Sequence, residues 1–295
     1  MRSQRYYGQN MARFNFWDFK LQLDDYFFEM VNYLQRTVFF IQKMGGKYRF
    51  LQANRELKAC HKGKRAFLVA NGPSIKKQDL KLLKDEITFF VNRSFLHEDY
   101  AYVQPTYHIF VDSKLSSGEW EITMLDKVLE KNPNVTFLLN HKWYFLEKFQ
   151  TYIEDPRFKI YWVNASLFTT PFHKKREIDL TTITYGSAVT GVAYMSSIYM
   201  GIEDFYFLGQ DGNGLCYELT DGDSHFYGTN PENHLKTSRD IYRDLYMMHL
   251  SLKHWCYFSD YCRDIGFNVY NCTEGGIFDM FERKRYQDLF DKRRR

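Results

Sequence analysis

Short apolar runs alternate along most of the chain with longer amphipathic segments. Apolar runs of four to six residues between turn-forming residues are typical of strands buried on both faces, and apolar residues three or four apart predict helices. Strands are expected near residues 66–70, 87–91, 106–111, 134–139, 158–163, 204–208 and 267–271. Helices are expected near residues 76–84, 119–131, 142–152, 187–200 and 236–258. This alternation predicts an α/β fold, a Rossmann-like and mostly parallel sheet with helices on both faces.

The N-terminal part of the chain does not follow this alternation. Residues 14–56 are rich in aromatic residues, and from Phe14 to Ile41 apolar residues recur three or four apart, with charges such as Asp24 and Glu29 between them. A helical segment is expected over 14–56. The pattern predicts an N-terminal helical extension that packs on the core, and a position in a membrane interface is the alternative.

Composition and charge narrow the class of protein. A net charge of +4 over 295 residues is too mild to indicate binding to nucleic acid. Basic residues crowd the C-terminus, in Arg283-Lys284-Arg285 and Lys292-Arg293-Arg294-Arg295. Such a tail either contacts an anionic membrane, at about 1 kcal/mol per residue, or is a solvated end. Aromatic residues make up 19% of the chain. They either fill the core or form a surface that binds sugar rings or membrane interfaces.

Cysteine usage and hydropathy suggest a compartment. The five cysteines form no Cys-x-x-Cys pair, so neither a disulfide framework nor a zinc site is indicated. The first residues lack the apolar core of a secretory signal, and no run reaches the roughly 18 apolar residues that span a bilayer. A cytoplasmic protein is expected, either free or peripheral at the inner face of the membrane.

The first predicted strand ends in Asn71-Gly72-Pro73-Ser74. A buried strand that turns tightly at a glycine and leads into a helix gathers backbone N–H groups around one point, which favours a phosphate or another anion. Pro73 fixes its own φ for the turn, and Ser74 can cap the following helix. The turn therefore predicts a ligand of nucleotide type.

Three other predicted strands end in a polar residue. These residues are Asn92, Asp112 and Asp211. Each alone is ordinary turn chemistry. Because the carboxyl ends of parallel strands meet at one edge of a sheet, the three residues and Asn71 together predict one pocket that holds an activated donor by its phosphate.

Two more segments are candidates for binding. Residues 184–194 are small and rich in hydroxyl groups at the start of a helix, which allows a ligand to approach the backbone or the helix to pack closely on the sheet. Residues 212–236 are polar, contain glycine and show no periodicity. A loop of that length in a compact domain is usually functional, and a lid over the site is the preferred interpretation.

The chain contains, in this order, Phe67–Ile75, Asn92, Thr190–Met195, Ile202–Asp211 and Asp223–Gly228. This ordered set resembles a family of bacterial sialyltransferases that modify lipooligosaccharide from a CMP-activated sugar.

The chain resembles more closely still a bacterial group linked to surface-polysaccharide synthesis, which shares the Asn-Gly-Pro-Ser start and ends with a segment like Phe267–Gly276. It is also similar to archaeal hydroxymethylpterin diphosphokinases. The resemblance covers about 66–276. With it, we expect an extension over 1–60, a nucleotide-sugar-binding domain over 61–280 and a basic tail over 281–295.

The resemblance implies roles for the residues that bind the donor. The turn Asn71-Gly72-Pro73-Ser74 would hold the phosphate and ribose of the nucleotide. Asn92 and Asp112 would flank the donor, with Asp112 where the sialyltransferases have an amide. Thr190 and Gly191 would hold the carboxylate of the sugar.

The resemblance also implies the groups that carry the reaction. Tyr217 would stabilise the departing phosphate, and the position of a second such tyrosine is Asn213 here. The sialyltransferases place a catalytic histidine four residues after the histidine of a Ser-His pair, where this chain has Thr229. The general base is therefore His225, His234 or Asp211, unless the chemistry differs.

Three functions follow. The first is an inverting glycosyltransferase that adds a sugar from a donor expected to be CMP-linked. Its acceptor would be a lipopolysaccharide, lipooligosaccharide or capsule glycan, and no cofactor or metal is needed in principle. The second is a Mg²⁺-dependent diphosphokinase with Asp112 and Asp211 as metal ligands. The third is a non-catalytic nucleotide- or glycan-binding subunit. A dinucleotide oxidoreductase is not supported, because no Gly-x-Gly-x-x-Gly follows the first strand.

Overall fold

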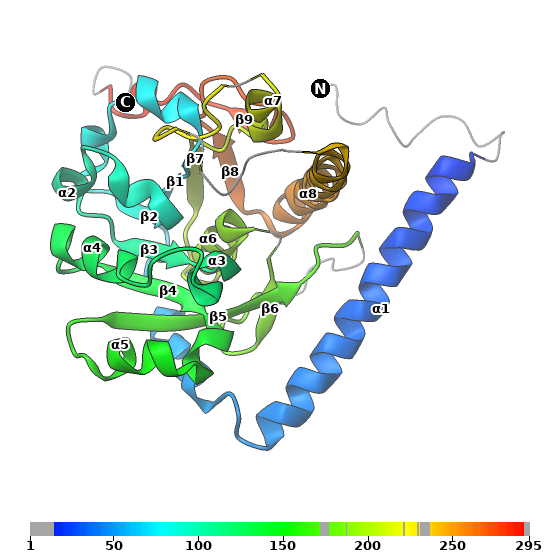
Figure 1. Cartoon of the computed structure of the whole chain (residues 1–295), viewed down its shortest axis with the longest axis horizontal. Helices are drawn as coiled ribbons and strands as arrows, with labels where there is room; N and C mark the ends of the chain where they lie inside the picture. The colour runs from blue at the N-terminus through cyan, green and yellow to red at the C-terminus, as the bar shows by residue number, and fades with distance from the viewer. Residues whose placement is uncertain are drawn as a thin grey trace.

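A computed structural model describes residues 15–171, 177–186, 188–220, 222–228, 230 and 237–291. Its described strands form one sheet in the order β6-β5-β4-β3-β2-β1-β7-β8-β9, and every neighbouring pair is parallel (Figure 1). The strands are β1 (Arg65–Val69), β2 (Ile87–Val91), β3 (Tyr107–Phe110), β4 (Thr136–Asn140), β5 (Lys159–Leu167), β6 (Ile183–Tyr185), β7 (Asp204–Leu208), β8 (Asn268–Asn271) and β9 (Glu282–Arg283). The predicted α/β fold with a parallel sheet is confirmed.

The strands follow from their apolar runs, and all seven predicted strands are present. In β1, β2 and β7 every residue after the first is buried, as expected for strands covered on both faces. The two strands that we did not predict, β6 and β9, have three and two residues, which is too short for a periodic pattern. β9 contains Arg283, whose guanidinium donates to the carbonyls of Thr273 and Gly275. The basic C-terminal segment therefore begins inside the sheet.

Helices connect the strands. The α-helices are α1 (Phe16–Met44), α2 (Tyr100–Val103), α3 (Ser113–Ser117), α4 (Met124–Lys131), α5 (Gln150–Glu154), α6 (Val189–Tyr199), α7 (Gly214–Glu218) and α8 (Ser238–Ile265). Short 3-10 helices are η2 (Arg49–Leu57), η3 (Pro73–Lys77), η4 (Leu80–Leu83), η5 (Asn92–Leu96), η6 (His141–Phe145), η7 (Glu147–Phe149) and η9 (Gln287–Leu289). The predicted helix over 76–84 is replaced by η3 and η4, because Asp79 begins a new turn by accepting from the Lys81 N–H.

Both faces of the sheet are covered. On one face α6 and α8 form an aromatic core, in which the buried ring of Tyr194 lies 4.7 Å from Phe205 and 4.9 Å from Trp255. On the other face the short helices bury a second cluster that includes Phe67, Phe90 and Trp143. Helices on both faces are therefore confirmed.

The order of the strands reverses at β1. From β1 to β6 the chain moves steadily towards one edge of the sheet, and α6 then returns across β5, β3, β2 and β1 to place β7 on the other side of β1. In open α/β sheets ligands bind outside the carboxyl ends of the strands at such a reversal. The topology therefore points to the loops that follow β1 and β7.

The N-terminal extension consists of α1 and η2, and α1 runs diagonally along one side of the domain (Figure 1). In the parts of the chain that the structure describes, no helix combines the length and apolar character needed to cross a bilayer.

Candidate functional site

The loops after β1 and β7 interlock. The Gly72 N–H donates to the Gly209 carbonyl at 2.7 Å, and the Ser74 N–H donates to Asp211 Oδ2 at 3.3 Å. A side chain at position 72 would overlap the Asp211 carboxylate, so only glycine fits there. The structure thus brings the predicted residues Gly72, Ser74 and Asp211 into direct contact.

This contact changes what the turn offers to a ligand. The sequence led us to expect free N–H groups around a phosphate, but the N–H groups of Gly72 and Ser74 already have acceptors, and Pro73 has no N–H. The turn instead presents oxygen acceptors, namely the Asp211 carboxylate and the Asn71 side-chain amide. Such acceptors suit the hydroxyl and amino groups of a nucleoside.

The Asp211 carboxylate is buried from solvent. Only 6% of the residue is exposed, and burial raises the pKa of its carboxyl above the ordinary value, while hydrogen bonds from Ser74 and the charge of Lys77 oppose that rise. Its backbone carbonyl accepts from the Ile277 N–H at 2.9 Å, which ties the loop after β7 to the loop after β8. Asp211 is therefore held in place by its own backbone and by the turn after β1.

Asn71 connects this turn to the neighbouring strand end. Its Nδ2 donates to the carbonyl of Val91, the last residue of β2, at 3.3 Å. Its Oδ1 is buried and has no hydrogen-bond partner among the described residues. An unpaired buried acceptor is costly, and a hydrogen bond from a ligand would satisfy it.

Asn92 directly follows β2 and has an uncommon backbone conformation. Its φ is +47°, in the left-handed region that non-glycine residues adopt mainly at turns and functional sites. Its Oδ1 is likewise buried without a partner among the described residues. The ends of the adjacent strands β1 and β2 thus each carry an unpaired amide oxygen.

His108 in β3 stabilises the backbone at Asn92. Its Nε2 lies 2.9 Å from the Asn92 carbonyl oxygen, and its Nδ1 lies 2.8 Å from the hydroxyl of Tyr100. Burial lowers the pKa of His108 to about 3, so the ring is neutral. Since a carbonyl only accepts, Nε2 carries the proton and Nδ1 accepts from the Tyr100 hydroxyl.

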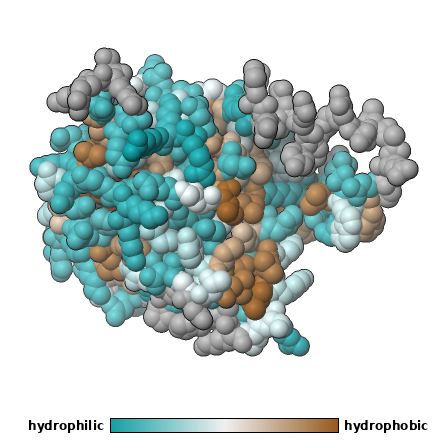
Figure 2. Space-filling model, turned by 90° about the horizontal axis from the view of Figure 1, so that it is seen from above, coloured by the Kyte–Doolittle hydropathy of each residue, from teal (hydrophilic) through white to brown (hydrophobic). Residues whose placement is uncertain are grey.

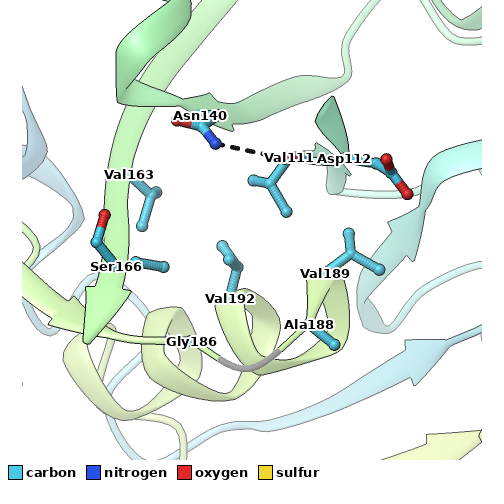
Figure 3. A pocket seen from close by; sticks show the side chains of 10 residues that line it. Val111, Asp112, Asn140, Val163, Ser166, Gly186, Ala188, Val189 and Val192 are labelled. Carbon is cyan, nitrogen blue, oxygen red and sulfur yellow. Dashed lines mark hydrogen bonds between the residues drawn. The ribbon is translucent and has the colours of Figure 1, made fainter. Parts of the chain in front are cut away.

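A cavity of about 360 Å³ opens at the ends of the neighbouring strands. It is lined by Val111, Asp112, Asn140, Val163, Ala165, Ser166, Gly186, Ala188, Val189 and Val192. Figure 3 shows valine side chains around its centre, from the strand ends and from α6, and polar side chains at its edge. The cavity therefore combines an apolar wall with a polar rim.

Two polar residues of this rim follow β3 and end β4. Asp112 is a predicted residue, and its Oδ1 accepts from the Lys114 N–H at 3.0 Å at the start of α3. The sequence analysis did not find Asn140, whose Nδ2 donates to the Val111 carbonyl at 3.3 Å (Figure 3). Asn140 is the last residue of β4, so the rule that found the other strand ends applies to it equally.

The first turn of α6 lies against this cavity. Ala188 is the N-cap residue and has no side-chain oxygen to accept from the N–H groups of the first turn. The predicted residues Thr190 and Gly191 are in this turn, and both are buried. Gly191 lines a separate and much smaller hollow beside Trp255, and Ala188, Val189 and Val192 are the residues of α6 and its N-cap that line the cavity.

The described part of the predicted lid contacts the turn after β1. The Phe226 N–H donates to the Asn71 carbonyl at 2.9 Å, and Lys76 lies 3.4 Å from the carboxylate of Asp223. The Gly222 N–H donates to the Tyr217 carbonyl at 2.7 Å, so α7 and this segment are joined. The segment over 222–228 therefore lies next to the predicted nucleotide site.

The described part of the predicted lid contains three of the predicted site residues. His225 Nδ1 lies 3.0 Å from the Ser224 hydroxyl, and the imidazole stacks on Tyr227 with ring centroids 5.0 Å apart. Tyr217 is half-buried in α7. Asn213 precedes α7, and its Oδ1 is buried with no partner in the described part of the chain. Thr229 and His234 lie outside the described residues.

The predicted residues therefore fall into three groups. Asn71, Gly72, Ser74 and Asp211 are in contact, with Asn92 at the next strand end. Asp112 and α6 border the cavity, and Tyr217 and His225 lie in the lid. Within the described residues no group of three or more His, Cys, Asp or Glu side chains is arranged to hold a metal ion, so Asp112 and Asp211 are not part of such a group.

No protein-family model and no curated protein matches this chain. Solved structures similar to it include the sialyltransferase CstII from Campylobacter jejuni in complex with the substrate analogue CMP-3FNeuAc, with 18% identity, a TM-score of 0.44, and coverage of 74% of this chain and 86% of that one. The sialyltransferase CST-II in complex with a trisaccharide acceptor and CMP has 16% identity, a TM-score of 0.43, and coverage of 74% and 85%. The apo form of an alpha-2,3-sialyltransferase from Campylobacter jejuni has 12% identity, a TM-score of 0.37, and coverage of 74% and 79%. At TM-scores below 0.5 these likenesses carry no inference about the activity of this chain.

Proposed function

We propose that this chain is an inverting glycosyltransferase that takes its sugar from a CMP-linked donor. The observation that carries the proposal is the pair of buried, unpartnered amide oxygens of Asn71 and Asn92 at the ends of adjacent strands. Buried acceptors are normally satisfied by hydrogen-bond donors. A nucleoside offers such donors in its ribose hydroxyls and, in cytidine, in an amino group. The buried carboxylate of Asp211 beside them is a third acceptor, of the kind that binds ribose hydroxyls in other parallel α/β sheets.

The cavity at the ends of β3 and β4 is the proposed sugar site. Its volume of about 360 Å³ lies in the range of small-molecule pockets. Its valines suit the apolar face of a sugar ring, and the rim residues Asp112 and Asn140 suit its hydroxyls. The N-terminus of α6, with Thr190 and Gly191 in its first turn, favours an acidic sugar, because helix N-termini attract anions.

The proposed chemistry is a single displacement. The oxygen of an acceptor hydroxyl bonds to the anomeric carbon as the bond from that carbon to the CMP phosphate oxygen breaks, and the hydroxyl proton passes to a base. We assign the base to His225, whose ring is oriented by Ser224 and by stacking on Tyr227. The electron pair of the broken bond stays on the phosphate, where Tyr217 and Asn213 would stabilise its charge.

The lid has a second role in this proposal. An activated sugar is open to hydrolysis, so a segment that lies over the nucleotide and excludes water favours transfer to the acceptor. The bond from Phe226 to Asn71 places the His225 segment against the nucleotide turn. We propose a cell-surface glycan as the acceptor, namely lipopolysaccharide, lipooligosaccharide or capsule, and a location at the inner face of the membrane.

Turnover of candidate donors tests the proposal. The full chain is incubated with CMP-sugars, UDP-sugars and ATP, with and without EDTA, and nucleotide release is followed in the presence of glycan acceptors. CMP release that depends on an acceptor and persists in EDTA is the expected result. Mg²⁺-dependent release of AMP from ATP would instead identify a diphosphokinase. Thermal stabilisation by a nucleotide without turnover would identify a binding subunit.

A further inference from the structure

Helix α1 presents an apolar face to solvent. Among the described residues 23 large hydrophobic side chains are exposed, and 13 of these lie on this 29-residue helix. In Figure 2, which keeps the left and right of Figure 1, the larger hydrophobic patches lie on the half of the molecule that carries α1 and α8. Contiguous apolar surface of this extent marks an interaction site.

The opposite face of α1 attaches the helix to the domain through polar groups. Asp25 pairs with Lys253 of α8 at 2.6 Å, and both side chains are almost fully buried. The Asn32 side chain exchanges two hydrogen bonds of 2.8 Å with the backbone of Phe168. Arg36 donates to the hydroxyl of Tyr185 at 2.8 Å. The same side also packs Phe28 on Phe168 and Phe39 on Tyr48. An ordinary surface helix turns most of its apolar side chains inward, whereas most of the large hydrophobic side chains of α1 face outward, so the helix is largely inverted.

The exposed side chains follow a heptad repeat. Nine positions, alternately three and four residues apart, run from Phe16 and Phe19 to Phe40 and Met44, and all nine are exposed. Only Thr37 among them is polar, and we call these nine positions the α1 seam. A seam of period 3.5 over four heptads is a pattern by which one helix pairs with another. Five further exposed hydrophobic side chains widen the face around the seam, namely Trp17, Phe27, Leu34, Val38 and Ile41.

We propose that the α1 seam pairs with the α1 seam of a second copy of this chain, antiparallel and about a two-fold axis. Thirteen half-exposed hydrophobic side chains present on the order of 1,000 Å² per protomer, and a stable interface needs roughly 800 Å² per partner. The interface of a two-fold dimer is self-complementary, which a single repetitive helix face satisfies.

The charges of α1 support pairing with a second copy of the chain and an antiparallel orientation of the two helices. α1 carries four acidic and three basic residues, so it lacks the basic polar face that attracts a helix to an anionic bilayer. Asp18 lies in its first turn and Lys43 in its last. An antiparallel pair places Asp18 of one copy near Lys43 of the other and opposes the two helix dipoles, whereas a parallel pair sets like charges together.

Sedimentation of the full chain at micromolar concentration tests the pairing. The wild-type chain is expected to sediment as a dimer. The double variant Leu23→Glu/Met30→Glu should sediment as a folded monomer, with the dissociation constant raised at least about a hundredfold, because each charge would be buried without a partner. The matched control Leu96→Glu changes an exposed leucine away from α1 and should remain a dimer. Circular dichroism of all three chains confirms that they are folded.

Three outcomes overturn the proposal. A wild-type chain that is monomeric at these concentrations contradicts the proposal. If that monomer binds vesicles of phosphatidylglycerol and phosphatidylcholine, the α1 seam is a membrane-binding surface instead. A dimer that survives the double substitution shows that another surface pairs the chains.

Orientation is tested by a thiol-specific cross-linker in a background with serine at the exposed Cys60, Cys216 and Cys256. Met30→Cys, near the middle of the seam, should link to itself and Met44→Cys should not; self-linking at both positions contradicts the antiparallel arrangement.

Discussion

The Asp211 carboxylate lies where a side chain at position 72 would stand, so Gly72 and Asp211 fit together only because residue 72 has no side chain. The two residues are 139 positions apart in sequence, but they follow the adjacent strands β1 and β7. Their contact joins the two loops at the point where the order of strands reverses. The proposed nucleotide site is built on this contact.

Replacing Gly72 should damage the site and the fold together. Gly72→Ala places a methyl group on the Asp211 carboxylate, and we expect unfolding free energy to fall by about 2–3 kcal/mol and nucleotide binding to be lost. Urea denaturation measures the first effect and calorimetry the second. Gly45→Ala is the matched control, because its new methyl group meets only ordinary contacts at 3.5 Å and its φ is −73°. Equal stability of the two variants would show that the loops separate easily.

Two substitutions of Asn92 separate its backbone from its side chain. Asn92→Gly keeps the left-handed conformation at no steric cost, so stability should stay near that of the wild-type chain while the amide is lost. Asn92→Ala also strains the backbone and should cost about 1 kcal/mol or more of unfolding free energy. Both variants should bind CMP at least about tenfold more weakly. Unchanged CMP affinity in the glycine variant would remove Asn92 from the site.

The buried histidines make the fold sensitive to acid. Burial lowers the pKa of His108 to about 3 and those of His141 and His254 to about 4. These pKa values lie below the value near 6.5 of a histidine in the unfolded chain. At pH values between about 3 and 6.5 the unfolded chain therefore binds more protons than the folded chain. The stabilisation is thus fully present above pH 6.5 and is lost as pH falls towards 3, at up to about 1.4 kcal/mol per pH unit for each histidine.

Unfolding by urea at several pH values between 7.5 and 4.5 measures this slope. His108→Gln should be less stable at neutral pH, because hydrogen bonds are lost, but should show a shallower decline towards acid. A variant whose stability declines as steeply as that of the wild-type chain would mean that His108 does not contribute to the slope.

The lid histidine should matter for turnover and not for nucleotide binding. His225→Gln removes the proposed base, so turnover should fall by about 10²–10⁴-fold, with CMP affinity changed by less than about threefold. Tyr227→Leu, which removes the stacked ring, should have a smaller effect on turnover. If His225→Gln retains wild-type turnover, the base is another group.

The strands were predictable because apolar runs buried on both faces carry their own signal. The end of β2 shows this, since Phe89, Phe90 and Val91 predicted both the strand and the polar residue after it. Asn140 directly follows the strand predicted over 134–139, so the same rule pointed to it as well, although it is the last residue of β4 in the structure. The sequence analysis missed this residue of the cavity because the rule was not applied to that strand.

Other features depend on contacts between distant segments, which a sequence read in order does not contain. The acceptor for the Ser74 N–H comes from Asp211, and the sequence alone left that N–H available to a phosphate. The inverted face of α1 is a further case. Its periodicity predicted a helix correctly, but only the partners of Asp25 and Asn32 reveal which face meets the domain.

The most direct test of the proposed nucleotide site is calorimetric titration of CMP into the wild-type chain, Asn71→Ala and Asn134→Ala. Asn134 is an exposed asparagine that precedes β4, at the opposite end of the strand from the carboxyl ends that form the site, and it serves as the control. We predict that CMP binds the wild-type chain and Asn134→Ala with affinities within about twofold, and that Asn71→Ala weakens binding at least about tenfold. Failure of CMP to bind the wild-type chain, or equal affinity in Asn71→Ala, would contradict the account.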